Sequence, residues 1–281
     1  MKLRIATCRT LPEVDVDEAP LAEALARGGF EAELLAWDDP SIDWDAPAPT
    51  ILRSTWNYSL DVARFAAWID RVAAAGPLFN PREVVHDNLY KRYLLALAAR
   101  GVPVVPTLLV ERGETRALDE LAIGARIVIK PEVGAGSRDT RVFAAGDAGA
   151  VAHLARVTAH GAALVQPYLD SVDDYGERSL VHIDGELSHA IRKAPRFSGD
   201  SESVTGPFPI ADDERAVAAA ALAPYPDLLY ARVDLARDAD GQPRVMELEL
   251  VEPSLFFTRS PDAADRYVAG LRRRLHSLPT T

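Results

Sequence analysis

Short apolar runs alternate with helix-like patterns through the first third of the chain. The runs LRIATC, EAELLAW and TILRS have the length and composition of strands, whereas EAPLAEALARGG and DVARFAAWIDRVAAAG carry helical periodicity. Alternating strands and helices predict a parallel α/β sheet. Ser59 or Asp61 is suited to cap the second helix. We therefore expect an open-sheet domain over residues 1–82.

The middle of the chain changes from a helical pattern to short strands. The run NLYKRYLLALAAR predicts one helix that carries Lys91, with Asp87 or Asn88 as its N-cap and Gly101 as its stop. The strand RIVIKP, the loop EVGAGSRDT and the strand RVF follow, which predicts a small sheet with a glycine turn. We assign residues 83–165 to this second subdomain.

The last part of the chain has the pattern of antiparallel strands. ERSLVHI and ELSHAIRK flank Asp184-Gly185, a dipeptide that favours the positive backbone angles of a tight hairpin. LLYARVDLA and PRVMELEL are joined by the turn-forming residues 238–241. With a closing amphipathic helix near 262–275, these strands define a third subdomain over residues 166–281.

Composition and charge restrict the class of protein. The chain has 48% hydrophobic residues, enough for a sizeable core, and a net charge of −11, which argues against a nucleic-acid partner. The single cysteine, Cys8, excludes an intrachain disulfide. The N-terminal run has neither the length nor the composition of a signal peptide, and no stretch approaches the length of a membrane span. We expect a cytoplasmic protein without a membrane partner.

Acidic residues alternate with apolar ones near the end of the chain. Glu247 and Glu249 share one strand face, and Asp234 lies on the neighbouring strand of the predicted hairpin. Three carboxylates in a largely apolar hairpin repel one another unless a cation lies between them. Magnesium prefers such ligands together with phosphate oxygens. A solvated face with salt-bridged glutamates is the alternative that this pattern leaves open.

A glycine loop follows a lysine at the end of an apolar strand. Lys130 terminates the run Ile-Val-Ile, where a half-buried ammonium needs an anionic partner. Gly134, Gly136 and Ser137 follow it, and two glycines let backbone amides approach an anion. The spacing is neither a Walker loop nor a dinucleotide fingerprint. An ordinary β-turn and solvated surface lysines, including Lys91, are the competing interpretations.

Two arginines lie on facing strands of the predicted hairpin. Arg178 and Arg192 could each clamp a phosphate or a carboxylate through two parallel hydrogen bonds. Pairing with Glu177 or Glu186 at the surface is the structural alternative.

These motifs, taken in order, resemble the ATP-grasp superfamily. The set comprises Lys91, IVIKP, GAGSRDT, QPYL, RVDL and MELE. The resemblance implies an α/β (α+β) ATP-grasp fold, in which an N-terminal open parallel sheet precedes two β-rich subdomains that clasp ATP. Many relatives have Asn where this chain has Glu249, so this chain carries one more negative charge there.

The resemblance also implies roles for individual residues. Lys91 and Lys130 would bind the ATP phosphates, with the glycine loop closing over them. The hinge residues would read adenine with their backbone; they are Gln166, Pro167, Tyr168 and Leu169. Asp234, Glu247 and Glu249 would hold Mg²⁺ on the phosphates.

Within the superfamily, stretches such as ATCRTLPEVDVDEAPL, LRSTWNY and MELELVEPSLFF look most like the O-ureido-serine cyclo-ligase of cycloserine biosynthesis and its relatives. In that family ATP phosphorylates a carboxylate, and an internal nitrogen then displaces phosphate. Arg192 would stabilise the developing charge and Arg178 would orient the substrate. The polar loop after a strand and two later residues would bind a small amino-acid-like substrate; they are Arg53, Ser54, Thr55, Trp56, Asn57, Glu252 and Ser254.

Three functions remain open at the level of sequence. The first is a cyclo-ligase, and the second is an intermolecular amide or dipeptide ligase, which differs only in where the amine resides. The third is a nucleotide-binding module without turnover. The sequence is also compatible with a homo-oligomer, and it does not decide whether residues 196–210 form a lid.

Overall fold

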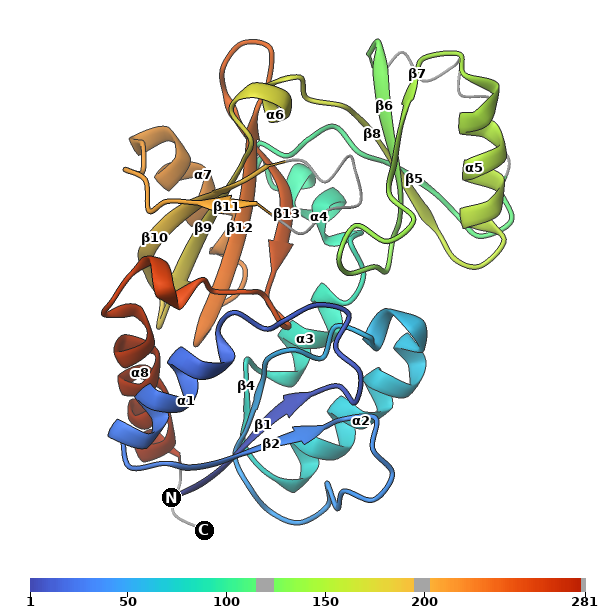
Figure 1. Ribbon diagram of the computed structural model, residues 1–281. Helices are drawn as coiled ribbons and strands as arrows, with labels where there is room; N and C mark the ends of the chain where they lie inside the picture. The colour runs from blue at the N-terminus through green and yellow to red at the C-terminus, as the bar shows by residue number, and fades with distance from the viewer. Residues whose placement is uncertain (115–123, 195–202, 279–281) are drawn as a thin grey trace.

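The computed structural model describes residues 1–114, 124–194 and 203–278, and its strands form three sheets with helices packed on them (Figure 1). The N-terminal sheet has the order β2-β1-β3-β4 with every pairing parallel, as the alternating pattern predicts. Asp61 caps helix α2 by accepting a hydrogen bond from the Arg64 N–H. This part contains β1 (Lys2–Thr7), α1 (Glu18–Arg27), β2 (Glu31–Ala36), β3 (Thr50–Leu52), the 3₁₀ helix η1 (Tyr58–Leu60), α2 (Val62–Ala75) and β4 (Leu78–Phe79).

The predicted helix after residue 83 is instead two short helices, α3 (Arg82–Asn88) and α4 (Tyr93–Ala99). Lys91 lies between them, and neither Asp87 nor Asn88 is an N-cap, because both belong to α3. The Lys91 N–H is bonded to the Glu132 carbonyl, and the Asn88 side chain is bonded to a distant strand. These contacts draw the chain out of helical geometry.

The middle sheet is antiparallel, with the order β5-β8-β6-β7. Helix α5 packs on one face of it, and the two share an apolar core (Figure 1). The elements are β5 (Leu108–Val110), β6 (Arg126–Pro131), β7 (Arg141–Ala144), α5 (Ala148–Thr158) and β8 (Ala163–Pro167). The glycine loop connects β6 to β7, as the sequence predicts.

The third sheet has the order β11-β10-β9-β12-β13 and is antiparallel throughout. The Asp184-Gly185 hairpin is confirmed, with both residues at positive φ. Helix α7 covers one face of the sheet. The elements are α6 (Ser171–Asp174), β9 (Glu177–Ile183), β10 (Glu186–Lys193), β11 (Val204–Thr205), α7 (Asp212–Leu222), β12 (Tyr230–Arg237), β13 (Pro243–Glu249), the 3₁₀ helix η3 (Phe257–Arg259) and α8 (Ala263–Ser277).

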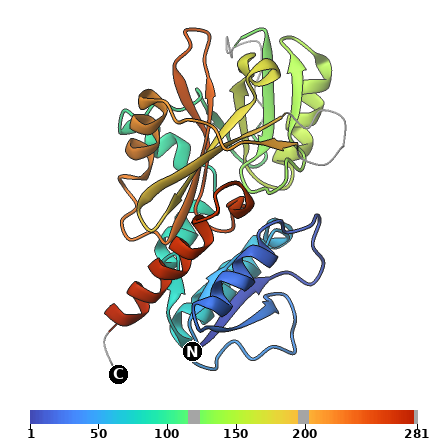
Figure 2. The same ribbon diagram turned by 60° about the vertical axis from the view of Figure 1, so that its left-hand side comes forward.

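The last helix returns to the first. Helix α8 lies beside α1 in both views, and the two helices share a core with the lower part of the third sheet (Figures 1 and 2). Arg27 Nη2 donates to Asp265 Oδ1 across this contact at 2.8 Å. The division into 1–82, 83–165 and 166–281 stays a prediction; its second boundary falls within β8.

Two further expectations from the sequence concern a possible lid and a possible membrane span. Of residues 196–210, the part 196–202 lies outside the described residues, and the described remainder begins with β11. Among the described helices, none has the length and apolarity needed to cross a membrane.

Candidate active site

One cavity of about 1350 Å³ is lined by strand residues of the second and third sheets, by the segments around them, and by loops that follow strands of the first sheet. Most of the predicted site residues meet in it. They are Trp56, Asn57, Lys91, Lys130, Gly134, Gly136, Ser137, Gln166, Pro167, Tyr168, Leu169, Glu247, Glu249, Glu252 and Ser254. Predicted site residues as far apart in sequence as Trp56 and Ser254 therefore contribute to a single site.

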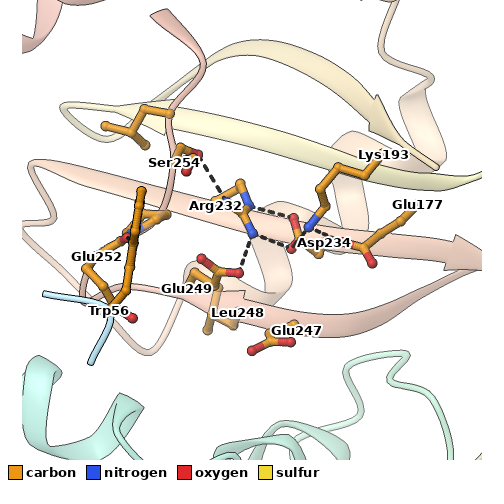
Figure 3. A network of polar contacts seen from close by, with 12 residues as sticks. Trp56, Glu177, Lys193, Arg232, Asp234, Glu247, Leu248, Glu249, Glu252 and Ser254 are labelled. Atoms are coloured by element: carbon orange, nitrogen blue, oxygen red, sulfur yellow. Dashed lines mark hydrogen bonds and ion pairs between the residues drawn. The ribbon is translucent and has the colours of Figure 1, made fainter. Parts of the chain in front are cut away.

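The acidic hairpin has the register that the alternating pattern predicts. Asp234 is directly opposite Glu247, and Arg232 is opposite Glu249, so these four side chains share one face (Figure 3). Leu248 points to the other face and is 1% exposed. The hairpin thus presents two glutamates to the cavity and keeps its apolar face in the core.

Asp234 is bound by two cations of the protein itself. Arg232 Nε and Nη2 each donate to its carboxylate at 2.9 Å, and Lys193 Nζ donates to Oδ2 at 2.8 Å (Figure 3). Burial opposes the charge of Asp234, but these cations outweigh it and hold the pKa of the carboxyl far below its usual range. Asp234 is 1% exposed and does not line the cavity.

The predicted three-carboxylate metal site is therefore not formed. Within residues 1–114, 124–194 and 203–278, no three histidine, cysteine or acidic side chains are grouped to hold a metal ion. Glu247 and Glu249 remain, and both line the cavity beside basic residues. Such a pair fits the preference of magnesium for one or two carboxylates supplemented by phosphate oxygens.

The two glutamates have different electrostatic surroundings. Glu247 Oε1 lies 2.9 Å from Lys91 Nζ. Burial opposes its ionisation, but Lys91 and Lys130 outweigh that effect and lower the pKa of Glu247. Burial raises the pKa of Glu249 to about 7, although Arg232 donates a hydrogen bond to it. Glu247 is thus the more firmly ionised of the two.

Two lysines and the glycine loop form the basic part of the cavity. Lys91 Nζ donates to the Gly134 carbonyl at 2.7 Å and so links the loop to Glu247. Lys130 is 8% exposed, and in the described part of the chain its ammonium has no hydrogen-bond or ion-pair partner. Burial lowers its pKa. A buried ammonium that faces a cavity without a partner is suited to bind an anion.

The predicted hinge residues end strand β8 at the cavity wall. Gln166 Nε2 donates to Thr107 Oγ1 at 2.8 Å, and the Tyr168 hydroxyl bonds Asp173. The Arg126 guanidinium lies over the Tyr168 ring, 4.1 Å from its centroid. These contacts fix the side chains of the segment.

Arg178 and Arg192 do not face the cavity. They are opposite each other on β9 and β10 and point to the face covered by α7. Arg178 donates to Glu214 on α7 at 3.0 and 3.2 Å, and the guanidinium of Arg192 lies over the Phe208 ring. The catalytic roles expected of both arginines are therefore not supported, because the register places them on the wrong face.

The polar loop after β3 is divided between the core and the cavity. Arg53 is 2% exposed and donates to Asp17 at 3.1 Å and to the Pro253 carbonyl at 3.0 Å. Ser54 bonds Thr7, and Thr55 is fully buried. None of these three residues, predicted to bind substrate, lines the cavity, and of the three only Arg53 contacts the segment after β13 in the described part of the chain.

The remaining loop residues do reach the cavity. Trp56 Nε1 donates to the Glu252 carbonyl at 3.0 Å, and Asn57 is held by Asp38 and Trp37. The Glu252 side chain is 9% exposed and has no partner among the described residues (Figure 3). Burial raises its pKa to about 8, with Glu249 adding to the effect.

Sequence reasoning missed Arg232, Lys193 and Glu177, which line the cavity. Lys193 bonds both Glu177 and Asp234. Arg232 could have been found, because it precedes Asp234 by two residues on a strand and therefore shares its face. Lys193 could not have been found in this way, because its place in the site depends on the register of β10 against β9.

Cys8 is buried and is not among the residues that line this cavity, and burial raises the pKa of its thiol. It has the character of a packing residue.

Comparisons with known proteins agree with this geometry. Residues 3–80 match the family model of the N-terminal domain of D-cycloserine synthetase DcsG. The chain is 39% identical to the cycloserine biosynthesis protein DcsG of Streptomyces lavendulae, covering 93% of this chain and 95% of that one. The crystal structure of D-cycloserine synthetase DcsG superposes with a TM-score of 0.89 at 38% identity, over 98% of this chain and 100% of the other. D-alanine–D-alanine ligase from Bacillus anthracis shares the fold, with a TM-score of 0.69 at 15% identity over 99% and 100% of the two chains.

Proposed function

Because the chain belongs to the DcsG family of ATP-grasp ligases, and is thus an ATP-dependent carboxylate–amine ligase, we propose that it closes a ring within one small amino-acid-like substrate. The substrate carboxylate would be phosphorylated by ATP, and a nitrogen of the same molecule would displace the phosphate. A carboxylate is a poor electrophile, and the acyl phosphate supplies the leaving group it lacks. The observation that carries the proposal is the meeting of Lys91, the two glutamates and Lys130, which has no partner among the described residues, in one cavity.

The basic part of the cavity is the proposed site of the ATP phosphates. Lys130 would gain the anionic partner that it lacks, and the glycine loop would offer backbone amides. Glu247 and Glu249 would hold Mg²⁺, which neutralises charge on the transferred phosphoryl group. The hinge residues 166–169 would contact adenine.

Arg232 replaces Arg192 as the proposed electrostatic catalyst. Its guanidinium lines the cavity and is held in place by Asp234 and by the Ser254 carbonyl. A cation fixed in this way loses little freedom when negative charge develops on the reacting carboxylate, which is the condition for effective transition-state stabilisation.

The acidic part of the cavity is the proposed substrate site. The Glu252 side chain is buried without a partner in the described part of the chain, and Trp56 Nε1 donates to the Glu252 carbonyl. A cationic amino group between the carboxylate and the indole would offset the cost of burying Glu252. Asn57 and Ser254 line the same region.

The surroundings of the enzyme are part of the same proposal. A net charge of −11 favours a small-molecule substrate over a nucleic acid. The unpaired Cys8 and the need for ATP favour the cytoplasm.

ADP release with MgATP tests the proposal across amino acids and O-substituted serines, each with and without a second amine. We expect turnover on one compound alone, with a product lighter by water. Strict dependence on a second amine would assign an intermolecular ligase instead. Reactions with EDTA in place of Mg²⁺ are the control and should be silent.

A further inference from the structure

The strand that carries the two cavity glutamates is an edge strand. β13 is the last strand of its sheet: it pairs with β12 on one side, and on the other side the described residues provide only an isolated bridge between Val104 and Val245. Backbone groups on its other side need partners, since an unpaired buried N–H or C=O is costly. At Val245 the partners are the Pro103 carbonyl and the Val105 N–H. Beyond Val245, side chains take over.

Two side chains form hydrogen bonds with the backbone groups on this open side of the chain, at Leu248 between the glutamates and at Leu250 beyond them. The Leu248 N–H donates to the Tyr93 hydroxyl at 3.0 Å, and the Leu248 carbonyl accepts from Asn88 Nδ2 at 2.9 Å. The Leu250 N–H donates to Asn88 Oδ1 at 2.8 Å. The Asn88 amide therefore takes the place of a peptide group in an adjacent strand.

The same segment carries Lys91, whose ammonium contacts Glu247. Asn88 and Tyr93 are three residues before and two residues after Lys91, and both bond the backbone of Leu248, the residue between the glutamates. The spacing of Lys91 and the glutamates is thus set by short bonds from both sides of the lysine. Side-chain pairing achieves this without a further strand.

We propose that Asn88 and Tyr93 are positioning residues that hold Glu247 and Glu249 in register with Lys91 for the binding of a magnesium–nucleotide complex. This inference rests on the proposed function, because it assumes that the glutamates bind the metal. Loss of either side chain frees one part of the β13 edge and lets the glutamates shift relative to Lys91. Supporting residues of this kind typically change metal affinity by about 10–100-fold when removed.

Asn80 provides a matched control. It is also a buried asparagine that bonds strand backbone, donating to the Tyr230 and Leu250 carbonyls at 2.8 Å. Its carbonyl accepts from the Leu229 N–H at 2.8 Å. It does not line the cavity. In sequence it precedes α3, whereas Lys91 follows that helix. It reaches the segment after β13 only at the Leu250 carbonyl and makes no bond to Leu248, the residue between the glutamates, so its replacement should lower stability while the glutamates keep their spacing from Lys91.

Calorimetric titration with MgADP, and with ADP in EDTA, tests the proposal on Asn88→Leu, Tyr93→Phe and Asn80→Leu. We expect Asn88→Leu and Tyr93→Phe to bind MgADP about tenfold more weakly while binding of metal-free ADP is unchanged. Asn80→Leu should bind both as the wild type does, with a lower unfolding midpoint in urea.

The outcomes separate the positioning role of Asn88 and Tyr93 from the proposed metal site itself. Equal MgADP affinity in Tyr93→Phe and the wild type would overturn the positioning role, even if Asn88→Leu does not fold. An equal loss in Asn80→Leu would also overturn it, because general destabilisation would then explain the effect. If the wild type itself gains nothing from Mg²⁺, the proposed metal site fails instead.

Discussion

Arg232 and Asp234 lie two residues apart on β12, and the guanidinium donates to both carboxylate oxygens at 2.9 Å. This pair turns the predicted metal ligand into a support for a cavity arginine. The same contacts neutralise the charge of Asp234 within the protein. The site therefore presents two glutamates, each paired with a basic residue, and one guanidinium held by Asp234.

Arg232→Lys should lower kcat about 100-fold, because one ammonium cannot keep both hydrogen bonds to Asp234 and still face the reacting carboxylate. The KM for ATP should change little. Steady-state ADP release measures both constants. Arg192→Lys is the matched control and should keep near-normal kcat, since Arg192 faces α7; a large loss there would reinstate it as a catalytic residue.

Glu247→Gln should reduce ADP formation by at least about 100-fold while leaving the fold intact, because the amide lacks the charge that a magnesium ligand supplies. Circular dichroism and turnover together measure this. Glu186→Gln, at an exposed position on β10, serves as the control. Near-normal turnover of Glu247→Gln would remove Glu247 from the metal site.

Lys130→Met should raise the KM for ATP by about 10–100-fold, the loss expected for one charge-assisted hydrogen bond to a phosphate. The KM for the amino-acid-like substrate should be less affected. Initial rates at varied ATP separate the two. Lys2→Met, at an exposed position, is the control. An unchanged KM for ATP would return Lys130 to a structural role.

Asp17→Asn should lower the free energy of unfolding by about 3–5 kcal/mol, since it removes the charge of the carboxylate that the buried Arg53 guanidinium bonds directly. Asp17 is 0% exposed, pairs with Arg53, and accepts backbone N–H groups of Phe256 and Phe257. Urea unfolding measures the change. Asp45→Asn, which breaks an exposed pair with Arg71, should change stability little.

His182→Phe should make the protein less sensitive to acid. Burial lowers the pKa of His182 from 6.5 to about 4, so between these values the unfolded state binds more protons than the folded state. Stability therefore falls as the pH drops from 6.5 to 4, by up to about 3 kcal/mol from this residue.

Urea unfolding at pH 7 and at pH 4.5 tests this prediction. The wild type should lose more stability than His182→Phe between the two pH values. His276→Phe, at an exposed position on α8, should behave as the wild type does. Equal losses in wild type and His182→Phe would show that His182 is not responsible.

Local patterns predicted much of this protein. The alternation of apolar and polar residues placed Glu247 and Glu249 on one face, and strand–helix alternation predicted the parallel first sheet. Asp184-Gly185 predicted its hairpin, because its backbone angles are a property of the dipeptide. The order of motifs, from Lys91 to the acidic strand, indicated the family.

Tertiary structure alone decided which residues meet. Within a strand, period two tells which side chains share a face, but not which face meets the cavity. Arg192 and Lys193 are neighbours on β10, yet only Lys193 lines the cavity. Arg53 is buried because Asp17 and the segment after β13 enclose it. The sequence by itself thus determined the elements and the chemistry they carry, while register and long-range packing, which depend on residues far apart in the chain, determined the site.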